Sequence, residues 1–364
     1  MASAQVAFAV AASSGHDLAG HYECAKRIPA IMEALEQARL TPDAQPQKIM
    51  EILGARTASK AELEAVHSPA HIADMRQKAL QDAPCVVADF EETPDNTTYM
   101  AKSSFDDALQ AVGSALAVVD AVMGGVQAAS HTKGFAVIRP PGHHATKEAP
   151  MGFCLFNNVA IAARYAQQRY GLRKVMIVDF DVHHGNGTQD LFYNDDSVLF
   201  IDIHQHQVWP GSGHVNESGQ GAGDGYTINV PLPVGSGHEA ALRTFQRVVQ
   251  PAAARFQPDI ILASAGYDAH MLDPLEKLNY QSATYHALVS SLMSLSDRLC
   301  SGRLAILLEG GYSFQGLSEG VCNSFQALIG GKPLHDIDAH GPAEPSGAVD
   351  EVLGEVVATH KLQQ

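Results

Sequence analysis

The feature that most constrains this chain is a short apolar run followed by regularly spaced acidic and imidazole side chains. The run covers Val175–Val178 and leads directly into Asp179, Asp181 and His183. Along an extended segment, alternate side chains point to the same face. Two carboxylates and an imidazole on one face are costly to bury unless a cation lies between them. The spacing therefore predicts a divalent metal site at the end of a buried strand rather than a solvated acidic turn.

Other apolar runs also end in side chains that can take part in catalysis. They are Phe135–Ile138 before His143 and His144, Val198–Ile203 before His204, Ile260–Ala263 before Asp268 and His270, and Leu304–Leu308 before Tyr312. Continuous apolar strands that alternate with helices are typical of a parallel sheet with helices on both faces. The carboxyl ends of parallel strands meet along one edge of the sheet. We therefore expect an α/β fold in which these distant loops converge.

The remaining segments are assigned from periodicity and from turn residues. A first strand is predicted at Gln5–Val10 and a polar surface loop at Ala83–Thr98. Helices are predicted at Ile28–Ala38, Ala61–His67, Pro69–Leu80, Phe105–Met123, Asn158–Tyr170, Glu239–Arg255, Ser282–Cys300 and Val349–His360. Composition does not change abruptly along the chain, so we predict one domain over residues 1–364, with a tail and last helix at about 331–364.

The overall charge and the cysteines limit the possible partners and compartment. The net charge is −16, which disfavours direct binding to nucleic acid or anionic membranes and favours cationic segments. The five cysteines are scattered and never in CxxC spacing, which indicates reduced thiols. No run is long enough to span a membrane, and the start lacks a basic signal-peptide region. We expect a soluble intracellular protein, in the cytoplasm if bacterial and in a plastid or mitochondrion if from a plant or alga.

Three side chains are predicted to bind the metal: Asp181, His183 and Asp268. Three protein ligands with an open fourth position are typical of a catalytic zinc site. Because two of the ligands are carboxylates, Fe²⁺, Co²⁺ or Mn²⁺ could also bind there. His270 is a further possible ligand, but we expect it to be a solvent-facing loop residue.

The pair His143 and His144 follows a rigid Pro-Pro-Gly turn near the predicted metal. Each imidazole needs a partner that fixes its tautomer, and we expect Asp179 for His143 and Asn186 for His144. Because one partner is charged and the other neutral, the two histidines should differ in basicity, as a general base and an electrostatic stabiliser do. Tyr312 follows two glycines and could donate a hydrogen bond to a developing oxyanion.

Two aromatic side chains, Phe153 and Trp209, are predicted to form an apolar channel to the metal. Trp209 is the only tryptophan. For Phe153, an ordinary core position is an equally good interpretation of the sequence alone.

Together these motifs resemble the zinc-dependent histone deacetylase family, in its class II-like branch. The motifs are RPPGHHA, MGFCLFNNVAIAA, VDFDVHHGNGT, SAGYDAHMLDPL and LEGGY, and the similarity covers nearly the whole chain. It is greatest to bacterial histone-deacetylase-like amidohydrolases and organelle-type plant histone deacetylases. The resemblance implies an arginase-like fold, one catalytic Zn²⁺ and a structural K⁺ beside Asp181. It also implies the following roles: His143 and His144 as the catalytic pair with Asp179 and Asn186 behind them, Tyr312 as the residue that polarises the carbonyl, Phe153 and Trp209 as channel walls, Gly152 as a backbone acceptor for the substrate amide, and Leu275 at the rim.

The chain departs from the family pattern in a few places. Asn186 replaces the aspartate of class I relatives, in agreement with class II. Asp202 lies where a small hydroxyl residue is usual near the K⁺, and the opening loop HYECAKR lacks a proline. Relatives specialised for acetylpolyamines carry a glutamate at the rim, whereas this chain has Leu275 there and Glu276 next.

The predicted function is metal-dependent hydrolysis of N-acetyl-lysine in proteins to lysine and acetate. The alternative substrates are small acetylated amines, either arylalkylamines such as N-acetylserotonin or acetylpolyamines. Two alternatives come from other functional classes: an arginase-like two-metal hydrolase and a non-catalytic protein that binds acetyl-lysine. No direct nucleic-acid or membrane partner is expected, and a homo-oligomer stays open.

Overall fold

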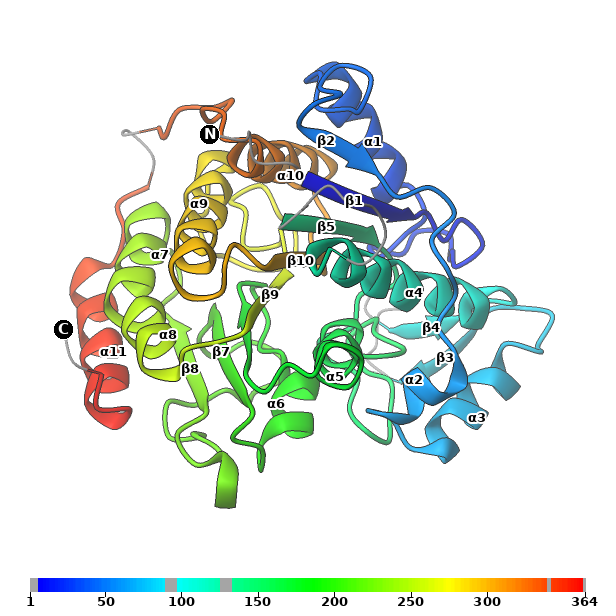
Figure 1. Ribbon diagram of the computed structural model, residues 1–364, viewed down its shortest axis with the longest axis horizontal. Helices are drawn as coiled ribbons and strands as arrows, with labels where there is room; N and C mark the ends of the chain where they lie inside the picture. Colours follow the sequence, from blue (N-terminus) through cyan, green and yellow to red (C-terminus); the bar gives the residue numbers. More distant parts are fainter. Residues whose placement is uncertain (1–5, 89–96, 125–132, 339–341, 363–364) are drawn as a thin grey trace.

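The computed structural model describes residues 6–88, 97–124, 133–338 and 342–362. Within these residues, the centre of the molecule is an eight-stranded sheet with strand order β2-β1-β5-β10-β9-β6-β7-β8 (Figure 1), and every strand pair in it is parallel. The strands are β1 Val6–Ala11, β2 Ile49–Glu51, β5 Lys133–Ile138, β6 Val175–Asp179, β7 Val198–Gln205, β8 Thr227–Leu232, β9 Ile260–Ala265 and β10 Leu304–Leu308. The predicted α/β class with a parallel sheet is confirmed.

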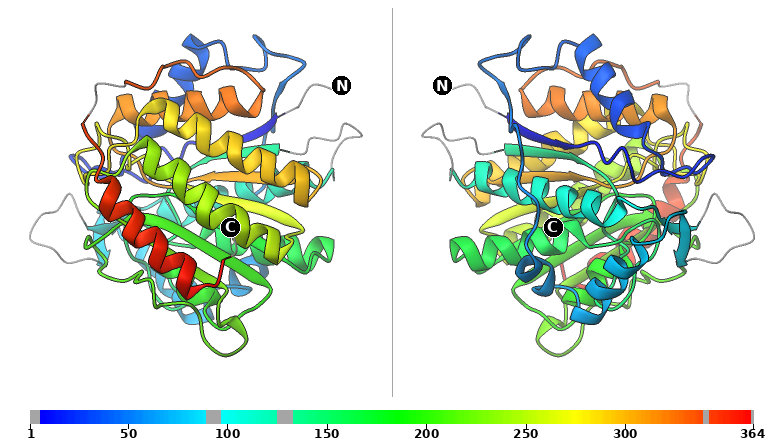
Figure 2. Two further views of the ribbon diagram at one scale, coloured as in Figure 1. Left: turned by 90° about the vertical axis from the view of Figure 1, so that its left-hand side faces the viewer. Right: turned by 90° about the vertical axis from the view of Figure 1, so that its right-hand side faces the viewer.

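Helices cover both faces of this sheet, as Figure 2 shows from two sides. One face carries α1 Arg27–Gln37, α7 His238–Thr244, α8 Gln250–Phe256, α9 Ser282–Leu299, α10 Phe314–Leu328 and α11 Ser346–Thr359. The other face carries α2 Lys60–Glu64, α3 Pro69–Lys78, α4 Ser104–Val122, α5 Asn158–Tyr170 and α6 Asn186–Phe192. No helix in the described part of the chain is long and apolar enough to cross a membrane.

The central strand β6 contributes alternate side chains to two separate cores. Met176 and Val178 pack among the helices of the α9 side, whereas Val175 and Ile177 pack on the α4 side. All four are fully buried. A strand covered on both faces needs apolar residues at every position, which is why the run before Asp179 is continuous.

Two predicted segments differ from the structure. The predicted loop Ala83–Thr98 contains strand β3, Cys85–Ala88, and its last residue begins β4, Thr98–Met100; the two pair antiparallel. The rest of that prediction, residues 89–96, lies outside the described residues. The predicted helix Glu239–Arg255 is interrupted by a π-helical turn at Phe245–Val249. Pro251 has no N–H to donate to the preceding turn, which accounts for the break in the regular α-helical ladder.

Several elements of the structure were not predicted from the sequence, for identifiable reasons. Strand β2 has three residues, and β8 contains Pro231, which is tolerated because β8 lies at the edge of the sheet. Helix α6 begins inside the Gly-rich turn after the metal-ligand motif. Helix α10 contains Gly316 and Gly320, which lower helix propensity. A Cβ at Gly320 would lie 2.4 Å from the Tyr267 ring, so this glycine permits close packing.

Candidate active site

The loops that follow different strands are joined by hydrogen bonds at the carboxyl edge of the sheet. Gly142, after β5, donates its N–H to the carboxylate of Glu309, after β10, at 2.6 Å. The N–H of Val182, after β6, donates to Asp268 Oδ1, after β9, at 3.0 Å. The expected convergence of these loops is therefore present.

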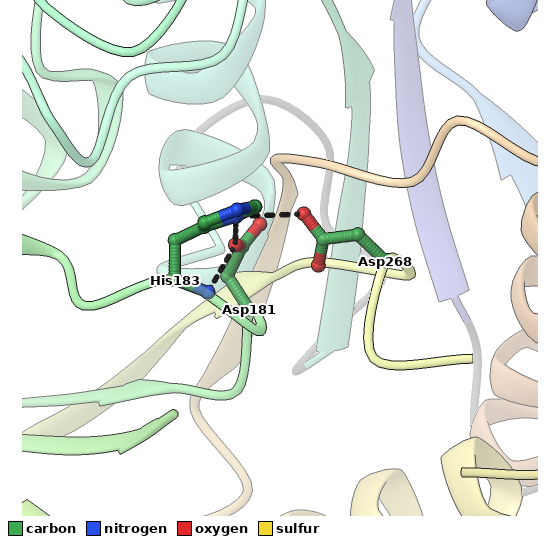
Figure 3. Close-up of side chains that lie close together, drawn as sticks. All are labelled: Asp181, His183 and Asp268. Carbon is green, nitrogen blue, oxygen red and sulfur yellow. Dashed lines mark hydrogen bonds and ion pairs between the residues drawn. The ribbon is translucent and has the colours of Figure 1, made fainter. Parts of the chain in front are cut away.

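The predicted metal ligands meet at this edge. One ligand atom each from Asp181, His183 and Asp268 lies within 4.8 Å of the others (Figure 3). His183 Nδ1 lies 3.2 Å from Asp181 Oδ1 and 3.4 Å from Asp268 Oδ2. Both carboxylates are 1% exposed.

Backbone turns, rather than strand alternation, place the first two ligands. Strand β6 ends at Asp179, so Asp181 and His183 lie outside it. The N–H of Asp181 donates to Asp179 Oδ1, and the N–H of His183 donates to Asp181 Oδ1, both at 3.0 Å. The reasoning from an extended segment was therefore wrong beyond Asp179, although the ligands do converge.

The donor set fits a divalent cation. Asp268 Oδ2 is buried and has no hydrogen-bond partner among the described residues. Burial, followed by the charge of Asp181, raises the pKa of Asp268 to about 7. A cation at this point would satisfy the orphan oxygen and offset the repulsion between the two carboxylates. One imidazole nitrogen and two carboxylate oxygens beside an open pocket are the donors of a catalytic rather than a structural site.

His270 does not join the ligand group, and its expected exposure to solvent was wrong. It is buried, and its Nε2 lies 3.0 Å from the hydroxyl oxygen of Ser282, the first residue of α9. Its ring also lies against Gly316 of α10, where an added Cβ would be 2.8 Å from Nδ1. His270 thus connects the Asp268 loop to two helices.

The two neighbouring histidines have the partners that the sequence predicted. His143 Nδ1 lies 2.9 Å from Asp179 Oδ2, and His144 Nδ1 lies 2.8 Å from Asn186 Oδ1. Both imidazoles are buried, and their ring centroids are 3.9 Å apart. His143 Nε2 is 3.8 Å from Asp181 Oδ1, so the pair borders the metal ligands.

The pKa values of the two histidines are shifted in opposite directions. Burial alone would lower the pKa of His143, but the charges of Asp179 and Asp181 raise it well above the ordinary value. Burial, with the charges of His143 and His183, holds the pKa of His144 well below the ordinary value. The two imidazoles therefore differ in basicity, as the sequence predicted, and such a difference suits a pair that divides acid–base work.

A narrow pocket of about 110 Å³ opens above these residues. Its lining includes the expected substrate-binding residues Gly152, Phe153, Trp209 and Leu275, together with Tyr312, Pro141, Glu276 and the three histidines His143, His144 and His183. Gly152 has φ +53°, and an added Cβ would lie 2.2 Å from the His144 ring. Only glycine fits that position beside the histidine.

The loop that carries Tyr312 is fixed from two sides. Asp273 accepts the N–H groups of Tyr312 at 2.8 Å and Ser313 at 3.2 Å. Arg27 donates to the carbonyl oxygens of Gly311 at 2.8 Å and Glu309 at 2.6 Å, and its guanidinium carbon lies 5.0 Å from the centre of the Tyr312 ring. Both contacts hold the phenol over the pocket.

The sequence analysis did not identify the buried ionic network behind this loop. Glu23 pairs with Arg139 at 2.6 Å and with Arg27 at 3.3 Å, and all three side chains are fully buried. Glu309 accepts the N–H groups of Gly142 and His143, which aims the histidine loop. Arg139 lies in the RPPGHHA motif, and Glu23 and Arg27 lie in the HYECAKR loop. The arginine close to the histidine pair was the feature of the sequence from which a buried ion pair could have been predicted.

Asp202, the unusual residue near the expected K⁺, has both carboxylate oxygens engaged. Oδ1 lies 2.6 Å from His204 Nδ1, and Oδ2 accepts the N–H of Gly185 at 2.8 Å. The side chain is fully buried. His204 therefore serves as the partner of Asp202 in the described structure.

Comparisons with known proteins agree with this geometry. A sequence profile of the histone deacetylase domain matches residues 21–328. "Histone deacetylase 14, chloroplastic" of Arabidopsis thaliana is 42% identical over 370 residues, covering 100% of this chain and 86% of that protein. "Polyamine deacetylase HDAC10" of Mus musculus is 38% identical, covering 85% of this chain and 45% of that protein. The crystal structure of the HDA15 HD domain superposes with a TM-score of 0.85 at 33% identity, covering 98% of this chain and 94% of that one.

The expected family, the arginase-like fold and the hydrolytic class are thereby confirmed, which excludes the non-catalytic binder, while one metal ion per chain stays a prediction. The domain match covers the two histidines, the ligand triad and Tyr312. The chain belongs to the histone deacetylase family, as a class II-like, metal-dependent amidohydrolase that removes acetyl groups from amines.

Proposed function

We propose that this protein hydrolyses the acetamide of N-acetyl-lysine in proteins, with Zn²⁺ as the catalytic ion. The observation that carries the proposal is the meeting, at the floor of one narrow pocket, of a three-ligand cluster and two histidines with partners of different charge. The walls formed by Phe153 and Trp209 suit the methylene stem of a lysine side chain.

In this proposal the residues of the chain divide the reaction between them. His144 donates through Nδ1–H to Asn186, which leaves Nε2 free to take a proton from the attacking water. His144 later gives this proton to the leaving amine, with help from His143, whose pKa is raised by Asp179 and which stabilises negative charge. A cation held by Asp181, His183 and Asp268 would supply Lewis acidity toward the water and the carbonyl.

Tyr312 is proposed to donate its phenol hydrogen to the oxyanion that forms from the substrate carbonyl. Its position on a loop held by Asp273 and Arg27 supports this role. Tyr312→Phe should lower turnover on an acetyl-lysine peptide about a hundredfold or more, because it removes an oxyanion donor. Metal content and thermal stability of the variant are measured in parallel; near-full activity would show that the role is wrong.

A panel of acetylated substrates tests the proposed function itself. Release of acetate is measured from an acetyl-lysine peptide, from N-acetylserotonin and from an acetylated diamine, and the metal is quantified in the same preparation. Hydrolysis of the peptide with about one zinc equivalent per chain is the expected result. Two equivalents per chain, or no hydrolysis of any acetamide by metal-loaded protein, would contradict the proposal.

Small acetylated amines are the second candidate, and one observation favours the cationic members of that class. The carboxylate of Glu276 lines the pocket, where a positively charged substrate would be stabilised. One relative is also named a polyamine deacetylase. The narrow pocket gives less support to bulky arylalkylamines.

The remaining proposals concern the second ion, the compartment and assembly. A structural K⁺ beside Asp181 is proposed from the family resemblance alone. We also propose an intracellular location, which fits cysteines that are scattered along the chain and never in CxxC spacing. A plastid is the proposed compartment if the source is a plant or alga, because the Arabidopsis relative is named chloroplastic. That the chain is one domain stays a prediction, and a homo-oligomer stays open.

A further inference from the structure

The pocket has one acidic side chain that the proposed reaction does not use. Of the described residues that line it, Glu276 alone carries a carboxylate, while the aromatic and aliphatic walls are uncharged. Glu276 lies in the loop between β9 and α9, directly after the rim residue Leu275. Its side chain is 20% exposed, so it is only partly screened by water.

The side chain of one glutamine forms a hydrogen bond with this carboxylate and another with the backbone of the next residue. Gln205, the last residue of β7, is buried and donates through Nε2 to Glu276 Oε2 at 2.9 Å. Its Oε1 accepts the N–H of Lys277 at 2.8 Å. A charged group held in this way loses little conformational freedom when a ligand binds.

In the described part of the chain, the ionisable partner of Glu276 is an imidazole rather than a lysine or arginine. Among the described residues, no lysine or arginine forms an ion pair with it, and the side chain of Lys277 is exposed to solvent without joining it. The nearest ionisable partner is His183, whose Nε2 lies 3.9 Å from Glu276 Oε1. That distance is too long for a hydrogen bond, so Glu276 does not act as an orienting acceptor for His183.

The position of Glu276 fixes where a complementary charge would lie on a substrate. Nδ1 of His183 faces the other metal ligands and Nε2 faces Glu276, so the carboxylate is one imidazole ring away from the ligand cluster. A cation that contacts Glu276 must therefore lie a short aliphatic chain away from the scissile acetamide.

The geometry points to Glu276, held by Gln205, as a specificity-determining residue that selects substrates with a positive charge close to the acetamide. The inference rests on the proposed deacetylase function and specifies the charge of its substrate. The cation is either the ammonium of an acetylated diamine or a basic side chain next to an acetyl-lysine. Both sources share one chemistry, an ion pair with a partly buried carboxylate.

Two matched substrate pairs test this inference. The small pair is an N-acetylated diaminobutane and N-pentylacetamide, in which a methyl group replaces the ammonium. The peptide pair carries arginine or glutamine next to the acetyl-lysine. Values of kcat/KM are measured for the wild type, Glu276→Gln and the control Glu355→Gln, which removes one negative charge from an exposed position on α11.

In Glu276→Gln, the preference for the cationic member should fall about tenfold in at least one pair, while the neutral member changes little. The preference within the small pair changes if Glu276 binds the ammonium of a diamine. The preference within the peptide pair changes if Glu276 binds a basic side chain. Glu355→Gln should keep the wild-type preference. An unchanged preference in both pairs overturns the inference, and so does an equal loss for charged and neutral substrates.

A binding measurement separates this inference from the proposed function. Trp209 lines the pocket and is the only tryptophan, so its fluorescence reports occupancy. Zinc-loaded Tyr312→Phe protein, in which hydrolysis should be slow, is titrated with the two small acetamides, with and without the Glu276→Gln substitution. Tighter binding of the charged one, lost in Glu276→Gln, supports the subsite even if no acetamide is hydrolysed. Equal affinities for the two acetamides, together with equal kinetics, would refute it.

Discussion

At the scale of single residues, the ligand cluster depends on a glycine that has no chemistry of its own. A Cβ on Gly310 would lie 2.1 Å from Asp268 Oδ2 and 2.6 Å from Asp181 Oδ2. The N–H of Gly310 also donates to Asp181 Oδ2 at 2.9 Å. The backbone of the EGGY loop therefore packs directly on two carboxylates and fixes their separation.

Gly310→Ala should weaken metal binding, because at least one carboxylate must move away from the added methyl group. We expect a loss of about 10- to 100-fold in affinity, the range seen when groups that support metal ligands are altered. Competition with a chelator measures it. Gly354→Ala, on α11 where an added Cβ meets nothing within 4 Å, is the matched control. If both variants bind metal like the wild type, the glycine is not needed for ligand placement.

At the scale of secondary-structure elements, a buried histidine connects the small helices to the catalytic loop. His67 lies between α2 and α3 and is 1% exposed. Its Nδ1 is 2.8 Å from the carbonyl oxygen of Thr146, after the histidine pair, and its Nε2 accepts the N–H of Asn157, the N-cap of α5, at 2.9 Å. These two bonds require the neutral imidazole.

This histidine makes folding stability depend on pH in the acidic range. Burial, followed by the charge of His71, lowers the pKa of His67 to about 3, from 6.5 in the unfolded chain. Between these values the unfolded chain binds a proton that the native protein does not, so stability falls as pH drops from about 6.5 toward 3.

His67→Gln should reduce this pH dependence, because glutamine can donate and accept but does not titrate. The slope of unfolding free energy against pH, measured by urea denaturation between about pH 4 and 6, should fall by up to about 1.4 kcal/mol per pH unit. Other buried histidines still contribute to the slope of unfolding free energy against pH in this variant. An unchanged slope in a variant that folds normally would mean that His67 does not contribute.

At the scale of the whole molecule, the net charge of −16 acts on the approach of substrates. An acidic protein attracts basic peptides over distances set by the Debye length, which shrinks from about 30 Å at 0.01 M salt to about 8 Å at 0.15 M. Substrate capture therefore has a salt-dependent part that is separate from the chemistry in the pocket.

Raising ionic strength over that range should increase KM for a basic acetyl-lysine peptide at least about threefold. KM for the uncharged N-pentylacetamide should stay nearly constant, because it has no charge to screen. Steady-state kinetics at fixed pH measure both. Equal salt effects on the two substrates would point to a change in the protein rather than to screening.

Much of the fold could be predicted from local sequence, because strand and helix patterns are local properties. Continuous apolar runs predicted β5, β6, β7, β9 and β10, and the residues after them predicted one functional edge. The elements that were missed are those whose residues look unfavourable in isolation. Gly316 and Gly320 disfavour a helix on propensity, yet α10 forms because these glycines let it pack against His270 and Tyr267.

By itself, the sequence determined the residue types of the site, the partners of the two histidines and the parallel sheet that gathers them. Ligand chemistry follows from the residue types, and the parallel sheet follows from continuous apolar runs that alternate with helices. Only the tertiary structure decided how the site is held. Glu23, Arg27 and Arg139 form a buried network, His270 is inside rather than exposed, and Gln205 aims Glu276 into the pocket. Such contacts join residues that are distant in the chain, and their distances exist only after the backbone has folded.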